Sequence, residues 1–481
     1  MLVVTSLLTG CAVGPDYTPP QLSTPKHFFG QSSLEKQDTI DDADLNAWWE
    51  RFGDEQLTRY ITIALKQNLD MAQAAARLAQ AQASLGAATA AMLPSGNVSG
   101  QAARSYQSVE TPLGQVLSSS PAFDRHGNSY EANLNASWEL DLFGGLRRDR
   151  EAAQAEYQAT SAGVAATRLA VAAQTAGIYI NIRALQTRLN IAHKQVETQQ
   201  QMLALTTLLY NKGLAAERQV QLSQASLAQV QASEPALEAG LDAALNALDV
   251  MLGTPPGTHR AELTTLAPIP VTPKITGMGT PGELITRRPD LIIAERHLAA
   301  SNAKIGASIA EYYPKLSLSG LIGSSTSIAE GNLFTGGAEQ AAGVFGLRWR
   351  LFDFGRIDAQ IAQAKGREAE MLAAYRLAVL RAAEDVEDSF STLVKREQQA
   401  TMLAQGVDAL SRARKASFSA YQKGTVSMIE VLQVDENLLQ VSDRQILAQA
   451  ESANAAVAAF KALGGGWQEH LVLGEQRRSN P

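Results

Sequence analysis

An internal repeat limits the folds that this chain of 481 residues can adopt. The segment Trp138–Gly144 recurs as Trp349–Gly355, 211 residues later, and both copies have the form Trp-x-Leu-x-x-Phe-Gly. The turn sequence Tyr210–Gly213 recurs as Tyr421–Gly424 at the same offset. Because one offset persists over so long a stretch, the sequence predicts two copies of one structural unit.

Upstream of these segments the offset between the copies changes. Pro94–Gly100 matches Pro314–Gly320 at an offset of 220 residues. The first copy therefore has nine more residues between Gly100 and Trp138 than the second copy has in the same place, which predicts a loop there. The proline-rich stretch 254–282 predicts the linker between the copies, because proline interrupts helices.

Four segments have the pattern of β-strands. Residues 130–142 alternate between apolar and polar side chains, which predicts a strand with one apolar face, long enough to cross a bilayer when tilted. Similar segments at about 95–107, 315–324 and 345–351 complete two predicted hairpins. Four strands cannot close a membrane barrel, and lipid does not tolerate an open sheet edge, so we expect the chain to oligomerise.

Very long helices are predicted after the hairpins. Gly355–Tyr421 contains no proline, and its apolar residues are mostly three, four or seven apart, which predicts one helix of about 100 Å. Gly144–Tyr210 is its counterpart in the first copy. Gly213 and Gly424 suit the left-handed residue that ends a helix. A returning helix is predicted after each turn, at about 217–252 and 428–463.

The first residues have the pattern of an export signal. An apolar, uncharged stretch leads to Leu8-Thr-Gly-Cys11, a lipobox, which predicts cleavage before Cys11 and acylation of its thiol. The stretch is short for a signal peptide and has no basic region. Ala12 follows the cysteine, and in similar bacterial lipoproteins the absence of aspartate there accompanies export to the outer membrane. Residues 12 to about 40 contain several prolines and predict an extended leader.

Composition argues against several functional classes. The net charge of −7 leaves no basic surface for a nucleic acid. One cysteine excludes an internal disulfide, and the six histidines are too dispersed for zinc-site spacing. The chain contains none of the common fingerprints of nucleotide binding or acyl transfer. We therefore expect no enzyme, no metal and no cofactor apart from the lipid on Cys11.

Taken together, these features resemble the TolC-like outer membrane factors, in particular the lipoprotein branch that serves resistance-nodulation-division efflux pumps. The resemblance covers nearly the whole chain and also rests on Cys11–Pro19, Trp48-Trp49, Arg287–Leu291 and the duplicated Tyr-x-Lys-Gly turns. It implies a mainly α fold with a membrane β-barrel. Each copy would be a strand hairpin joined to a long coiled-coil helical hairpin. A homotrimer would then form a twelve-stranded barrel and an α-helical periplasmic barrel.

The resemblance also implies a function and partners. The trimer would be a passive exit duct for drugs or other small molecules, located in the outer membrane and extending into the periplasm. A periplasmic adaptor would connect it to an inner-membrane transporter. We expect the Arg287–Leu291 segment to be a fold signature, in which Pro289 begins a helix and Asp290 lies near its positive end.

Two groups of site residues follow from this comparison and from the duplicated turns. The turns would contact the adaptor through Lys212, Gly213, Leu214, Lys423, Gly424 and Thr425. In similar ducts, acidic residues just beyond the second turn surround the narrowest aperture. Glu430 matches the first of two such positions and Gln433 the second, so three Glu430 carboxylates would act alone, while Tyr421 narrows the opening.

The sequence predicts six consecutive segments. The expected segments are a signal peptide at 1–10, a lipidated leader at 11–42, repeats at 43–253 and 283–464 around the linker at 254–282, and a C-terminal segment at 465–481 that would belong to an equatorial belt of the duct.

One alternative is the same duct in a type I protein secretion system. A second is a periplasmic coiled coil without a pore, which does not explain the alternation at 130–142. An enzyme is the weakest alternative.

Overall fold

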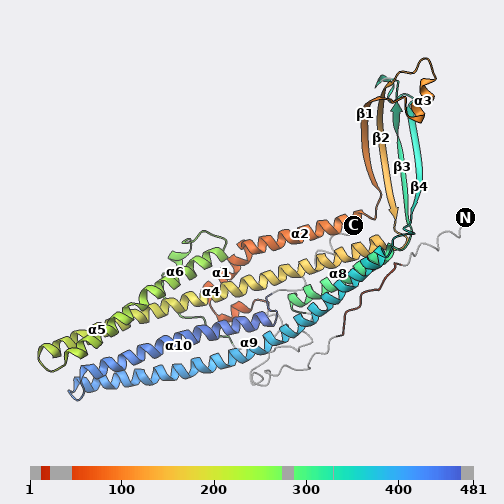
Figure 1. Cartoon of the computed structure of the whole chain (residues 1–481). Helices are drawn as coiled ribbons and strands as arrows, with labels where there is room; N and C mark the ends of the chain where they lie inside the picture. Colours follow the sequence, from red (N-terminus) through yellow and green to blue (C-terminus); the bar gives the residue numbers. More distant parts are fainter. Residues whose placement is uncertain (1–11, 22–45, 274–286, 329, 467–481) are drawn as a thin grey trace. The chain divides into compact units, whose positions relative to one another are not determined.

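The computed structural model describes residues 12–21, 46–273, 287–328 and 330–466 (Figure 1). The predicted signal peptide, Cys11 and most of the C-terminal segment lie outside these residues. The described chain forms two units. The first comprises the described residues within Met1–Pro20, Ala79–Ala159 and Glu295–Ala374, and the second comprises the remainder.

The first unit contains a four-stranded antiparallel sheet in the order β1-β2-β3-β4 (Figure 1). A strand forms in each of the four predicted places: β1 (Ser95–Tyr106), β2 (His126–Leu140), β3 (Lys315–Thr326) and β4 (Glu339–Arg348). The predicted bounds of the fourth strand are wrong, because β4 begins earlier and ends before Trp349 and Leu351. β1 pairs with β2 and β3 with β4, as predicted for two hairpins, and β2 pairs with β3 to join the two copies. Within the described chain, β1 and β4 are therefore edge strands.

Equivalent contacts confirm the repeat within this unit. Trp138 donates its indole N–H to the carbonyl of Met92 at 2.9 Å, and Trp349 donates to the carbonyl of Tyr312 at 3.0 Å. These residues are related by the offsets of 211 and 220 that the sequence predicts. The predicted loop between β1 and β2 contains a short helix, α3 (Pro112–Ser118), which Thr111 caps.

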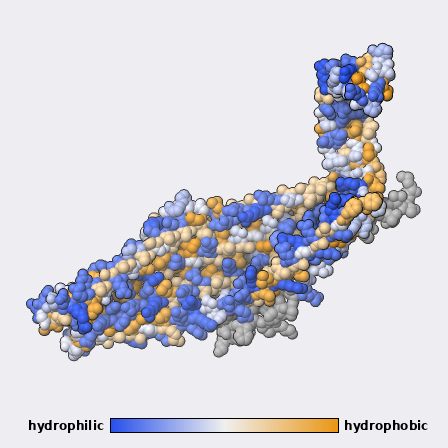
Figure 2. Space-filling view, in the orientation of Figure 1, coloured by the Kyte–Doolittle hydropathy of each residue, from blue (hydrophilic) through white to orange (hydrophobic). Residues whose placement is uncertain are grey.

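The two faces of the sheet differ in polarity. Val98, Leu134, Leu318 and Phe345 lie on one face, and between 48% and 79% of each residue is exposed to solvent in the single chain. The other face carries mostly serine, asparagine and charged side chains, together with Leu321 and Val344. Figure 2 shows hydrophobic and hydrophilic residues close together on the surface of the strands. A sheet with an exposed apolar face needs an apolar partner or a lipid environment.

The two predicted long helices are α4 (Gly145–Asn211) and α9 (Arg356–Gln422), each of 67 residues. Each follows a left-handed glycine, Gly144 (φ 81°) or Gly355 (φ 82°). The Asp353 carboxylate accepts from the backbone N–H groups that begin α9, and Asp141 accepts from those of α4. Among the residues that the structure describes, the helices lack an apolar stretch of the length that a membrane-spanning helix requires.

The returning helices differ between the copies. In the second copy, α10 (Met428–Ala462) is continuous as predicted. In the first copy, the predicted single helix over 217–252 is wrong: the chain forms α5 (Glu217–Gln231) and α6 (Ser233–Met251), separated at Ala232. Pro235 accounts for the interruption, because its ring cannot donate a hydrogen bond and clashes with the carbonyl four residues earlier.

The second unit buries its core among these helices. It also contains the helices α1 (Glu55–Gln67), η3 (Trp48–Phe52) and η4 (Arg260–Leu263), together with the first parts of α2 (Leu69–Ala90) and α8 (Pro289–Ala310). Trp48 is fully buried and stacks on Phe460 of α10, with ring centroids 5.5 Å apart. Much of the remaining core is alanine, which allows long helices to pack closely.

Candidate functional site

The two predicted turn sites have the same geometry. Gly213 (φ 70°) and Gly424 (φ 74°) are left-handed, as predicted. In the first turn, the N–H of Leu214 donates to the carbonyl of Leu209 at 2.9 Å; in the second, the N–H of Thr425 donates to the carbonyl of Ala420 at 3.0 Å. This six-residue closure satisfies the last carbonyls of α4 and α9. The turns lie at the same end of the second unit (Figure 1), and their residues Lys212, Gly213, Leu214, Lys423, Gly424 and Thr425 are exposed.

The predicted gate residues are close to the second turn. Tyr421 precedes the turn at the end of α9, and Glu430 and Gln433 lie on one exposed face of α10 because they are three residues apart. Glu430 also takes part in the helix cap: its N–H donates to the Ser427 hydroxyl at 3.4 Å. The Ser-x-x-Glu spacing is a capping signature that could have been recognised in the sequence.

The first copy has a neutral residue at the place of Glu430. Gln219 occupies that position, and its side-chain oxygen accepts from the N–H of Ala216 at 3.3 Å. The negative charge at Glu430 is therefore not required to begin the returning helix. The structure places the predicted gate residues on the surface of one protomer and brings none of them into a closed site.

An arginine that the sequence did not single out holds the leader in the first unit. Arg148 of α4 is almost completely buried and donates to the carbonyls of Val13 (3.2 Å) and Gly14 (3.3 Å) and to the Asp16 carboxylate (2.7 Å). The N–H of Val13 donates to the carbonyl of Phe143 at 3.1 Å. The described leader residues are thus attached to the junction between β2 and α4.

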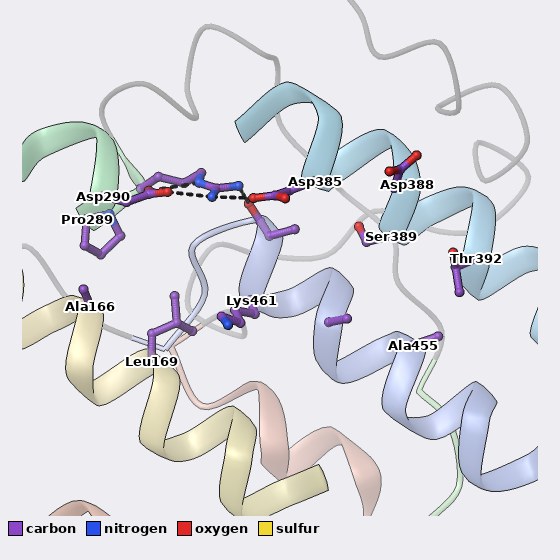
Figure 3. A pocket seen from close by; sticks show the side chains of 13 residues that line it. Ala166, Leu169, Pro289, Asp290, Asp385, Asp388, Ser389, Thr392, Ala455 and Lys461 are labelled. Atoms are coloured by element: carbon purple, nitrogen blue, oxygen red, sulfur yellow. Dashed lines mark hydrogen bonds and ion pairs between the residues drawn. The ribbon is translucent and has the colours of Figure 1, made fainter. Parts of the chain in front are cut away.

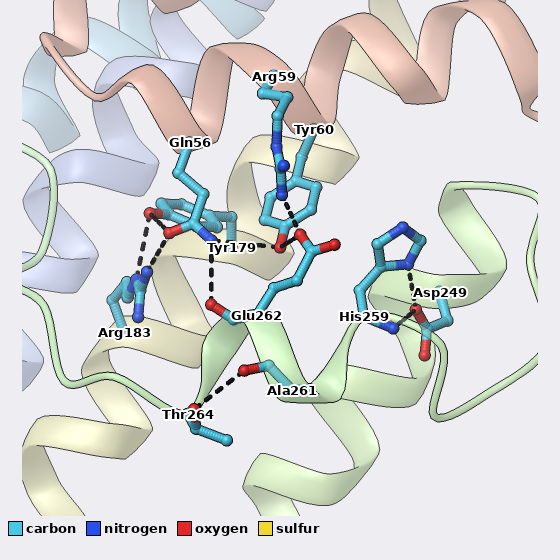
Figure 4. A network of polar contacts seen from close by, with 10 residues as sticks. All are labelled: Gln56, Arg59, Tyr60, Tyr179, Arg183, Asp249, His259, Ala261, Glu262 and Thr264. Carbon is cyan, nitrogen blue, oxygen red and sulfur yellow. Dashed lines mark hydrogen bonds and ion pairs between the residues drawn. The ribbon is translucent and has the colours of Figure 1, made fainter.

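A polar network in the second unit resembles a catalytic cluster at first sight (Figure 4). The buried Asp249 carboxylate accepts from the His259 ring at 2.7 Å. Nearby, Arg183 donates to the Tyr179 hydroxyl at 3.1 Å, and burial raises the pKa of Tyr179 to about 12. Arg183 also donates to the carbonyl of Thr265 at 2.9 Å. Gln56 of α1 donates to the carbonyl of Glu262 in the linker at 3.4 Å, and the N–H of His259 donates to Asp249 of α6 at 3.1 Å. The network therefore fixes the start of the linker against α1, α4 and α6.

A cavity of about 430 Å³ lies beside the Arg-Pro-Asp segment (Figure 3). Arg288 forms its charged wall and binds Asp290 and Asp385 at 2.7 and 2.9 Å. It also donates to the carbonyl of Ala462 at 3.1 Å, where α10 ends. Pro289 is the first residue of α8, as expected, and Asp290 lies in its first turn. These contacts give the segment a structural role, in agreement with its interpretation as a fold signature.

Groups of histidine, cysteine and carboxylate side chains that could hold a metal ion are absent from the part of the chain that the structure describes. The sites described above consist of helix ends, turns and ion pairs.

Comparison with known proteins agrees with this picture. The profile of the family described as Outer membrane efflux protein matches residues 60–254 and 280–465. The pyoverdine export outer membrane protein OpmQ of Pseudomonas putida is 30% identical over 430 residues, covering 88% of each chain. The cation efflux system protein CusC of Escherichia coli O6:H1 is 27% identical, covering 96% of this chain and 97% of its own.

The solved structure of the outer-membrane channel OprN is also similar, with a TM-score of 0.82 and 29% identity over 95% of this chain and 100% of that one. These relatives are channels or efflux and export proteins, so they do not favour the protein-secretion alternative or a coiled coil without a pore. The chain belongs to the outer membrane efflux protein family, and it is an outer-membrane efflux duct with the TolC-like fold.

Proposed function

We propose that three copies of the chain form a passive exit duct for drugs or other small molecules in a tripartite efflux pump. The observation that carries this proposal is the sheet with two edge strands, β1 and β4. Unpaired backbone groups at such edges cannot face lipid. Cyclic pairing of β4 of one protomer with β1 of the next removes every edge, and three protomers give twelve strands.

The polarity of the sheet supports the same arrangement. In a closed assembly the face with Val98, Leu134 and Phe345 would meet lipid, and the polar face would line water. The long helices α4 and α9 would extend the duct into the periplasm.

The lipid anchor on Cys11 is part of this proposal. The residues that follow the cysteine are held at the end of β2, since Val13 pairs with the carbonyl of Phe143. An acyl chain on Cys11 would anchor this end of the chain to the bilayer. Intact-mass measurement of the mature protein tests the anchor: a chain that begins at Met1 without added lipid mass contradicts it.

The partners would be a periplasmic adaptor and an inner-membrane transporter. We assign the adaptor contact to the two turns, whose exposed glycine, lysine and neighbouring residues repeat the same shape twice per chain. We assign the gate to Glu430, with Tyr421 and Gln433 beside it. The duct itself would contain no metal or other cofactor and would carry out no chemical reaction.

Native mass spectrometry of the detergent-solubilised protein tests the assembly. We expect a homotrimer, and a stable folded monomer would contradict the proposal. Conductance in planar bilayers then tests the duct. In cells, deletion of the gene should increase sensitivity to pump substrates, and the intact gene should restore resistance.

A further inference from the structure

Two positive charges oppose each other at the base of the sheet. Lys315 of β3 and Arg348 of β4 are direct cross-strand partners and therefore lie on the same face. Like charges in this arrangement destabilise a sheet. Because the Lys315–Arg348 pair lowers the stability of its own hairpin, stability does not explain why these residues occur there.

The first hairpin shows that the fold does not need these charges. Its equivalent residues, at the offsets of 220 and 211, are Ser95 and Ser137. They are also direct partners, and their hydroxyl oxygens lie 3.0 Å apart. The same register thus accepts an uncharged pair in one copy and a doubly charged pair in the other.

The carboxylates around the pair do not neutralise it. Glu311 forms ion pairs with Lys315 and with Arg350, the latter at 3.0 Å, and Glu139 lies 3.8 Å from Lys315. Three cationic side chains therefore face two carboxylates. Arg348 is exposed and has no ion pair within the described residues. The cluster carries one net positive charge per chain.

We propose that Lys315 and Arg348 of the three protomers together form a ring of positive charge inside the β-barrel, at the end of the strands that leads into the helices. This ring would favour solutes that carry carboxylate, phosphate or similar anionic groups. This inference rests on the proposed function, because it assigns the polar face of the sheet to a water-filled lumen. Lys315 shares that face with Ser317 and Ser319, whereas Leu318 and Phe345 lie on the opposite face. A symmetric assembly repeats the cluster in each protomer.

The expected effect depends on ionic strength. Exposed charges act over about one Debye length, which is roughly 10 Å at 0.1 M salt and about 3 Å at 1 M. Positive charges that line a pore raise the local concentration of anions and lower that of cations. The ring should therefore bias passage at low salt and lose this influence at high salt.

The test replaces the charged pair by the pair from the first hairpin, as the double variant Lys315→Ser, Arg348→Ser. Reversal potentials in planar bilayers under a KCl gradient measure the permeability of chloride relative to potassium. We expect this ratio to fall by about twofold or more at about 0.1 M salt, and to differ little at about 1 M. The reciprocal variant Ser95→Lys, Ser137→Arg should raise it.

Arg104→Ser is the matched control. Arg104 is an exposed cation on the same face of β1 as Val98, opposite Asn128, so its loss should leave selectivity unchanged. Native mass spectrometry checks whether each variant retains the wild-type assembly. A double variant that conducts with wild-type selectivity at low salt overturns the charge ring and leaves the duct intact. A wild-type protein that forms no channel at all argues against the proposed function instead.

Discussion

Arg288 and Asn68 perform the same task in the two repeats. Arg288 donates to the carbonyl of Ala462 at 3.1 Å, and Asn68 donates to the carbonyl of Met251 at 3.0 Å. The donors are 220 residues apart and the acceptors 211, which are the offsets of the repeat. In each copy, a buried side chain before one helix therefore closes the end of the returning helix.

Removal of either donor should destabilise the second unit, and Arg288 should matter more. Arg288→Ala leaves the carbonyls of Ala382 and Ala462 and two carboxylates without their partner, so we expect a loss of about 3 kcal/mol in the free energy of unfolding. Asn68→Ala should cost about 1–2 kcal/mol. Chemical denaturation of the solubilised protein measures both. The exposed Arg381 of α9 provides the control, and an Arg288→Ala variant as stable as Arg381→Ala would disprove the capping role.

Valine at the turn glycines should impair pumping without preventing assembly. A Cβ atom at Gly213 or Gly424 meets nothing within 4 Å, so the cost comes from the left-handed backbone, at about 1–2 kcal/mol per turn. We expect reduced drug resistance in complemented cells, together with a normal trimer. Gly366→Val is the control, because Gly366 is exposed in α9 without a positive φ. Wild-type resistance in both turn variants would argue against adaptor contact there.

Local patterns account for the parts of the fold that the sequence predicted. The periodicity of apolar residues was sufficient to predict the strand at 130–142 and the helix from Gly355. Gly213 and Gly424 predicted the two turns, because glycine suits the left-handed conformation that ends a helix. The interruption at Ala232 also had a local signal, Pro235, which the helical pattern around it obscured. The offset between the copies added the pairing of equivalent elements.

Contacts between distant residues could not be predicted in this way. Arg148 binds Val13 and Asp16, more than a hundred residues earlier in the chain, and nothing in the sequence near Arg148 distinguishes it from Arg147 or Arg150. Lys315 and Arg348 are cross-strand partners only in the observed register of the β3–β4 hairpin. A shift of one residue in this register would separate them. Both features required the three-dimensional structure.

His297 should make stability depend on pH. Its ring lies 3.1 Å from the Glu156 carboxylate, and the hydrogen bond to Glu156 raises the pKa of His297. A raised pKa in the folded state stabilises the protein below the unfolded value of about 6.5, and this contribution is lost as the pH rises through the folded value. His297→Gln should therefore lower the Tm at pH 5 but not at pH 8. Glu156→Gln should remove the same contribution, and additive effects in the double variant would contradict the pairing.

Loss of the Arg148 side chain should release the leader. Arg148→Gln removes the bonds to the carbonyls of Val13 and Gly14 and the ion pair with Asp16. We expect faster hydrogen exchange in the peptide that contains residues 12–17, measured by mass spectrometry on the intact assembly. Arg150→Gln is the control, because Arg150 is exposed on the same helix and contacts only the Thr89 hydroxyl among the hydrogen bonds we observe. Equal exchange in the two variants would show that Arg148 does not hold the leader.

Glu430→Gln tests the proposed gate with little risk to the fold. Glutamine is the residue of the first copy, where Gln219 still bonds the N–H of Ala216 at the helix start. Loss of a favourable charge at the N-terminus of α10 should cost only about 0.3–1 kcal/mol. If three carboxylates surround the aperture, they attract cations, so the variant should show lower cation-over-anion selectivity and a weaker response of the current to acidification.

Planar-bilayer recordings of the wild type and the variant at neutral and acidic pH measure both effects. Glu436→Gln is the matched control on the same helix, because Glu436 is half-buried and bonded to Gln440 rather than exposed beside the turn. Selectivity that changes equally in both variants would indicate a general effect of charge on α10. If Glu430→Gln and the wild type give the same selectivity and the same dependence on pH, Glu430 does not line the aperture, and Tyr421 at the end of α9 becomes the first residue to replace.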